Sequence, residues 1–283
     1  MRRFLIMIAA AVIPAAMFAQ GQINTKKKNL EDFPEKTMKV VLSGNVFLDN
    51  EIENAIKNSW RISPYEFCSS EEYERLKDSP DHYFLIAVTG RFRKEAEPGI
   101  EMLSLVKGGK GSDKSLDKML EVATVPLRAA ESPSGREMVF LPALIDIIQE
   151  HVYASMDKDI YGYSGLENYS MNIGSAKGMN MIFSEDDIAG TVPESVRSSI
   201  FTGNISLEDE DDADEAMMQK RENTLVSYTV APADPQPGSF CYKLLIDAGT
   251  HKLYYFKKHK ITKNTGIGFL AEDLYRIAGR PRN

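Results

Sequence analysis

The chain has 283 residues, 43% of them hydrophobic and 27% charged, with a formal net charge of −7. This length and composition allow one large or two small domains with hydrophobic cores, and they exclude a disordered chain. An acidic chain without a basic tail also argues against nucleic acid or an anionic membrane surface as the main partner.

The first 19 residues have the layout of a secretory signal peptide. Arg2 and Arg3 precede an apolar run at residues 4–13, and small residues follow up to Ala19. The run is too short to span a membrane, and no cysteine near residue 19 could carry a lipid. Removing the two arginines from the 34 basic residues leaves 32 against 41 acidic residues, a net charge of −9. We therefore predict cleavage after Ala19 and a periplasmic or secreted protein without a membrane span.

The first half of the mature chain combines short strands with helices. Residues 20–36 are polar and predict a flexible leader. Apolar residues recur at helical spacing through residues 140–156 and predict the longest helix. The expected elements are a strand at 38–42, helices at 47–60 and 69–76, strands at 83–89, 100–107 and 122–127, and the helix at 140–156.

A similar order begins again after residues 159–178, which are rich in Gly, Ser, Asn and Tyr and predict a linker. The expected elements of the second half are a strand at 179–183, a helix at 184–201, a short helix that follows the acidic stretch 207–215, strands at 225–230, 240–246 and 252–261, and a helix at 269–278. The strands at 240–246 and 252–261 flank a four-residue turn with a glycine, which predicts a β-hairpin.

The two halves also match in spacing. A shift of 141 residues sets Leu42-Ser43 on Phe183-Ser184 and Trp60 on Phe201, and a shift of 129 sets Phe140-Leu141 on Phe269-Leu270. We therefore predict an α+β fold made of two similar tandem units, residues 37–158 and 179–283. Each unit is expected to be a mainly antiparallel sheet packed with helices in the order β-α-α-β-β-β-α, and a cleft between units is a common place for a ligand.

Motifs for catalysis, metal binding and cofactor binding do not occur. The loop Gly108–Ser112 lacks the spacing of a phosphate-binding loop, and Gly162–Gly165 lacks the last glycine of a serine elbow. The acidic run from Asp209 to Glu215 (Asp209, Asp211, Asp212, Asp214 and Glu215) has no EF-hand spacing, and the histidines form no zinc signature. The sequence therefore indicates no metal and no cofactor, and it leaves any catalytic residues unknown.

Tyrosines are the candidate ligand-binding residues. Tyr161, Tyr163 and Tyr169 lie in the expected linker, and Tyr254 and Tyr255 lie on the last strand among lysines. Tyrosines beside lysines can bind a small ligand or a glycan. Alternate residues of a strand can equally fill the core while the lysines protect a sheet edge from pairing with other chains.

The two cysteines, Cys68 and Cys241, leave two interpretations open. An exported protein can form a disulfide between an even pair of cysteines, and buried cysteines can also serve as small apolar residues. Spacing alone does not establish the geometry that a disulfide needs.

Two resemblances complete the interpretation. The cleavage region Phe18-Ala19-Gln20 and the overall layout resemble exported Gram-negative envelope proteins of unknown function. Residues 245–254 resemble the central hairpin of PepSY-type envelope domains, with His251 where that pattern has glycine. We expect a non-catalytic binding protein for a small ligand, a glycan or an envelope protein. The alternatives are an envelope hydrolase without a recognisable motif and a structural subunit that docks on another envelope protein.

Overall fold

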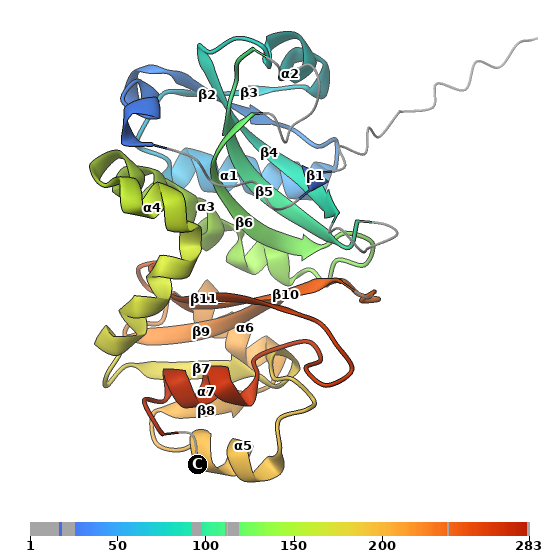
Figure 1. Ribbon diagram of the computed structural model, residues 1–283, viewed down its shortest axis with the longest axis vertical. Helices are drawn as coiled ribbons and strands as arrows, with labels where there is room; N and C mark the ends of the chain where they lie inside the picture. Colours follow the sequence, from blue (N-terminus) through green and yellow to red (C-terminus); the bar gives the residue numbers. More distant parts are fainter. Residues whose placement is uncertain are drawn as a thin grey trace, which may run out of the picture.

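The computed structural model of the protein describes residues 17–18, 26–91, 98–110, 112, 119–236 and 238–281. The chain forms an α+β fold with two mixed β-sheets stacked along the long axis (Figure 1). The predicted signal peptide lies outside the described residues except for Met17–Phe18 (β1), a short strand parallel to the end of β4.

The first sheet has the strand order β3-β2-β4-β5-β6. Strand β2 is parallel to both of its neighbours, β3 and β4, whereas the neighbouring pairs β4–β5 and β5–β6 are antiparallel. The elements of this unit are β2 (Thr37–Val41), α1 (Val46–Ser59), β3 (Tyr65–Cys68), α2 (Ser70–Leu76), β4 (His82–Arg91), β5 (Ile100–Lys107), β6 (Leu120–Ala129) and α3 (Arg136–Asp157).

The second sheet repeats this topology, with the order β8-β7-β9-β10-β11. Strand β7 is again parallel to both of its neighbours, β8 and β9, and the neighbouring pairs β9–β10 and β10–β11 are antiparallel. The elements of this unit are β7 (Asn180–Ser184), α5 (Glu194–Ile200), β8 (Ile205–Glu208), α6 (Glu210–Met218), β9 (Thr224–Val230), β10 (Phe240–Asp247), β11 (Leu253–Lys260) and α7 (Ala271–Ile277).

Helix caps recur at nearly the same spacing, about 140 residues, that relates the two units in the sequence. Ser69 caps α2 and Asp209 caps α6, 140 residues later, and each accepts a hydrogen bond from the backbone N–H three residues on. Trp60 and Phe201, 141 residues apart, end α1 and α5. The α+β class is confirmed, and the shared strand order and caps are consistent with two similar tandem units.

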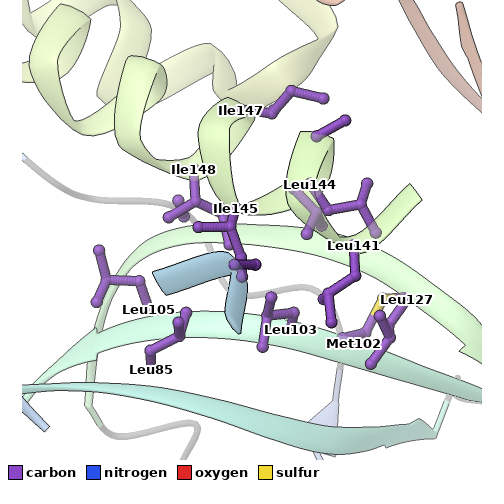
Figure 2. Close-up of a cluster of buried hydrophobic side chains, with 14 of the residues drawn as sticks. Leu85, Met102, Leu103, Leu105, Leu127, Leu141, Leu144, Ile145, Ile147 and Ile148 are labelled. Carbon is purple, nitrogen blue, oxygen red and sulfur yellow. The ribbon is translucent and has the colours of Figure 1, made fainter. Parts of the chain in front are cut away.

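Helix α3 lies between the two sheets (Figure 1). Figure 2 shows Leu141 and Ile145 of α3 directed at the first sheet, with Leu141 near Met102 of β5 and Leu127 of β6. On its other side, Phe140 stacks on Tyr228 of β9 with ring centroids 4.2 Å apart. One core therefore joins both units, because α3 buries apolar side chains against both sheets.

The second sheet divides its side chains between two cores, as alternation along a strand requires. Val226 and Leu244 belong to the core shared with α3, whereas Leu225 and Leu245 face a second core under α5 and α7. Burial of both faces explains why these strands read as continuous apolar runs in the sequence.

Several sequence expectations need correction. The two four-residue edge strands β3 and β8 were missed, and each described sheet contains parallel pairings beside its two antiparallel ones: three in the first sheet, one of them with β1, and two in the second. Phe269 and Leu270 precede α7, so they do not correspond to Phe140 and Leu141 in the second turn of α3. The expected linker is helical, with α4 (Asp159–Ser164) and the 3₁₀ segment η4 (Gly165–Ser175).

The expectation of a flexible leader is wrong for residues 26–36. Short 3₁₀ turns at Lys27–Asn29 and Phe33–Glu35 place Leu30 and Phe33 in the core. The Phe33 ring packs edge-on against Tyr83 with centroids 4.5 Å apart, and Asp32 accepts hydrogen bonds from Tyr83 and Lys107. Apolar contacts and an ion pair therefore hold this segment on the first unit.

Candidate functional site

A pocket of about 490 Å³ lies at the junction of the two units, between the N-terminus of α3 and helix α6. Five carboxylates and one arginine form most of its wall, and Val139 and Met218 add apolar surface. The described residues that line it are Ser134, Gly135, Arg136, Val139, Glu210, Asp211, Asp212, Asp214, Glu215 and Met218. We call this feature the acidic pocket.

The topology of the second sheet explains the position of the acidic pocket. From β7 the chain crosses to β8 on one side and then, through α6, to β9 on the other. Helix α5 packs on the second core and α6 on the shared core, so the two connections cover opposite faces of the sheet. Ligand sites in sheets with parallel strands form outside the carboxyl ends at such a switch point, and the carboxylates of α6 directly follow the end of β8.

Arg136, in the first turn of α3, closes the inner end of the acidic pocket. Its side chain is 7% exposed and donates to Asp214 Oδ1 at 2.8 Å, Asp187 Oδ1 at 3.1 Å and the carbonyl oxygen of Ser227 at 3.2 Å. The guanidinium also lies 5.5 Å from the Tyr228 ring centroid, a cation–π distance. These contacts join the first unit to η5 (Glu185–Asp187), α6 and β9 of the second.

The remaining charge of the pocket is negative. Burial raises the pKa of Glu210, and Asp214, Asp186 and Asp187 raise it further, although Arg136, whose Nε lies 3.7 Å away, opposes this. Burial likewise raises the pKa of Asp214 against the opposing effect of Arg136. Burial is the main cause of both shifts, and the neighbouring carboxylates add to it.

The structure brings only some of the predicted tyrosines together. Tyr161 and Tyr169 are partly buried neighbours with ring centroids 6.0 Å apart, and the Tyr169 hydroxyl lies 3.3 Å from Nδ1 of His151. The side chain of Tyr163 is outside the described residues. Neither Tyr161 nor Tyr169 lines the acidic pocket.

The tyrosines of the last strand are structural. Tyr255 is fully buried in the second core and donates its hydroxyl hydrogen to Asp273 at 2.7 Å, so a ligand cannot reach it. Tyr254 is half-buried against the same core, with the Lys252 ammonium 5.2 Å from its ring centroid. The edge of β11 is covered by η4, because Ser170 Oγ bonds to both the N–H and the carbonyl of Phe256. Core packing and edge protection therefore explain this strand.

The cysteines are free and buried, Cys68 in β3 of the first sheet and Cys241 in β10 of the second. The structure therefore lacks the disulfide that the sequence left open. Cys241 Sγ accepts a hydrogen bond from Gly268 N at 3.2 Å and serves as a small packed residue. Burial raises the pKa of the Cys68 thiol to about 11 and that of Cys241 to about 12.

Sequence reasoning noticed the acidic run and missed its arginine. Asp211, Asp212, Asp214 and Glu215 were considered only as calcium ligands. The signal for Arg136 is a single cation at the start of a long helix that is rich in apolar residues. Such a cation requires buried anions nearby.

Metal binding, membrane crossing and similarity to known proteins were each considered for this chain. Among the described residues, none of the His, Cys, Asp and Glu side chains form a group of three or more suited to a metal ion. Within the same residues, no helix is both long and apolar enough to cross a membrane. The chain matches no protein-family model, no curated protein and no solved structure, so the function has to be argued from the site itself.

Proposed function

We propose that this protein is a non-catalytic periplasmic or secreted binding protein, and that the acidic pocket takes a cationic organic group. The observation that carries the proposal is a pocket at the switch point of the second sheet with an excess of carboxylates. A cation there would offset the five carboxylates of the wall, which face a single guanidinium.

The ligand class follows from the lining. Glu210, Asp211 and Asp212 supply acceptors on one side, and Val139 and Met218 supply apolar contacts for a methylene chain. A protonated amine or a guanidinium on an aliphatic stem combines these two properties, as a lysine or arginine side chain does. We therefore propose a basic segment of another envelope protein as the ligand.

The test is titration of the full chain with a fluorescein-labelled tetralysine peptide, followed by anisotropy. The variant E210Q/D211N/D212N should lose about tenfold in affinity, on the order of 0.5 kcal/mol for each partly exposed carboxylate. The control E31Q/E71Q/D78N changes the net charge equally at exposed carboxylates outside the pocket. Equal affinity losses in the two variants, or no binding to the wild type, would show that the pocket is not the site.

A hydrolase remains the second candidate because Glu210 and Asp214 lie one turn apart with raised pKa values. Paired carboxylates with different environments can act as acid and base in glycoside hydrolysis. The hydrogen bond from Arg136 to Asp214 reduces the basicity of that carboxylate, which favours binding over catalysis. Release of nitrophenol from nitrophenyl glycosides that is lost in E210Q would favour the hydrolase instead.

A further inference from the structure

The second half of α3 carries two buried polar side chains one turn apart, His151 and Ser155, both 0% exposed. Nε2 of His151 and Oγ of Ser155 have no hydrogen-bond partner among the described residues. Buried polar atoms are nearly always paired, and leaving one unpaired costs roughly 1–3 kcal/mol. Two such atoms on one helix face therefore point to a bound molecule.

The geometry fixes which atoms face this molecule. The imidazole is oriented by Tyr169, whose hydroxyl lies 3.3 Å from Nδ1, and Tyr169 is held in turn by η4, which Ser170 anchors to β11. Nε2 is thus the ring nitrogen left for a ligand. Side chains at i and i+4 share a helix face with Cβ atoms about 5–6 Å apart.

We infer that this face of α3 binds one buried water molecule that bridges Nε2 of His151 and Oγ of Ser155. Side chains one helical turn apart have Cβ atoms about 5–6 Å apart, and one molecule that makes two hydrogen bonds of about 2.8 Å can bridge a gap of that size. Water is the smallest molecule that both donates and accepts, so it satisfies the imidazole and the hydroxyl whichever tautomer is present.

The charge and position of the site agree with a neutral ligand. Burial lowers the pKa of His151 to about 4, so the ring is uncharged at neutral pH. His151 lies 15 positions after Arg136, about 22 Å along the helix axis, so this site is separate from the acidic pocket. It lies beside Tyr169 and Tyr161, where the sequence predicted ligand-binding residues.

The experiment is a crystal structure of the full chain at a resolution that shows ordered water, solved for the wild type and for S155A. We expect a density peak within about 2.6–3.2 Å of both Nε2 and Oγ in the wild type. That peak should be lost or displaced toward His151 in S155A. The variant S59A is the control, because the Ser59 hydroxyl already donates to the carbonyl of Ala55 and its removal should leave the peak in place.

Two results would overturn the inference. A wild-type map without the peak would show that the two atoms find partners within the protein. A peak that stays at full height and in the same place in S155A would show that Ser155 does not hold the water.

Discussion

Replacing Arg136 with methionine tests the ionic junction between the units. Methionine keeps the length of the side chain and its packing on Phe140 and Tyr228, but it removes the guanidinium. Asp187 and Asp214, 2% and 8% exposed, then remain buried without their cation. Removing one partner of a buried ion pair costs about 3–5 kcal/mol, a large part of the 5–15 kcal/mol that stabilises a typical domain.

The assay is urea denaturation at pH 7 followed by far-UV circular dichroism. R136K should fall between wild type and R136M, because an ammonium keeps the charge without the planar fork that contacts two carboxylates. R75M removes an exposed arginine of α2 and should change the unfolding free energy by less than about 0.5 kcal/mol.

The pH dependence gives a second test of R136M. The raised pKa of Asp214 means that the folded state binds this proton more tightly than the unfolded state does. Its contribution to stability is therefore greatest at low pH and declines as pH rises above the usual 3.8. Without Arg136 the shift grows, so R136M should lose less stability at pH 5 than at pH 7. A destabilisation below about 1 kcal/mol, or one independent of pH, would refute the ionic account.

Three further predictions concern other buried groups. The unfolded state protonates His151 near its usual pKa of 6.5, whereas the folded state does so only near 4. The unfolding free energy should therefore fall as pH drops through this window, by at most about 1.4 kcal/mol per pH unit. H151F should flatten a series of urea-unfolding measurements across these pH values. S170A should lower the unfolding free energy by roughly 1–3 kcal/mol because both backbone groups of Phe256 lose their partner, and unchanged urea curves would contradict the edge-covering role of η4. The intact mass of the unreduced protein should show no loss of two hydrogens, and Cys68 and Cys241 should react with a thiol reagent only after unfolding. A mass lower by two hydrogens, or a thiol reaction in the native state, would contradict the buried free thiols.

Sequence patterns predicted the elements that are long or strongly periodic. The helix expected at 140–156 is α3 (Arg136–Asp157), and the three last strands lie within a residue or two of β9, β10 and β11. The four-residue strands β3 and β8 were missed because a short edge strand has too few residues to show a period.

The turn between β10 and β11 shows why local chemistry is hard to predict. His251 adopts a φ of +58°, a conformation that usually favours glycine, and its Nδ1 lies 2.6 Å from Asp146 Oδ2 of α3. That contact joins residues 105 apart in the sequence, so no local sequence pattern could predict it. The candidate site was missed for the same reason, because Arg136 and the carboxylates of α6 meet only after the units pack.

The two units differ most in their closing helices, and this difference creates the acidic pocket. α3 has 22 residues and is covered by both sheets, whereas α7 has 7 and covers one. An arginine at the start of the covered helix needs buried anions, and Asp187 and Asp214 supply them. Packing of the two units therefore accounts for two of the carboxylates near Arg136.

The other carboxylates need a separate reason. The helix dipole favours Glu210, Asp211 and Asp212 in the first turn of α6, but it disfavours Glu215 in the second half of that helix. Glu215 accepts a hydrogen bond from Gln219 one turn on and makes no contact with Arg136 among the described residues. Its place in the wall of the pocket agrees with the proposed cationic ligand. E215Q should therefore weaken binding of the tetralysine peptide while leaving the unfolding free energy within about 0.5 kcal/mol of the wild type.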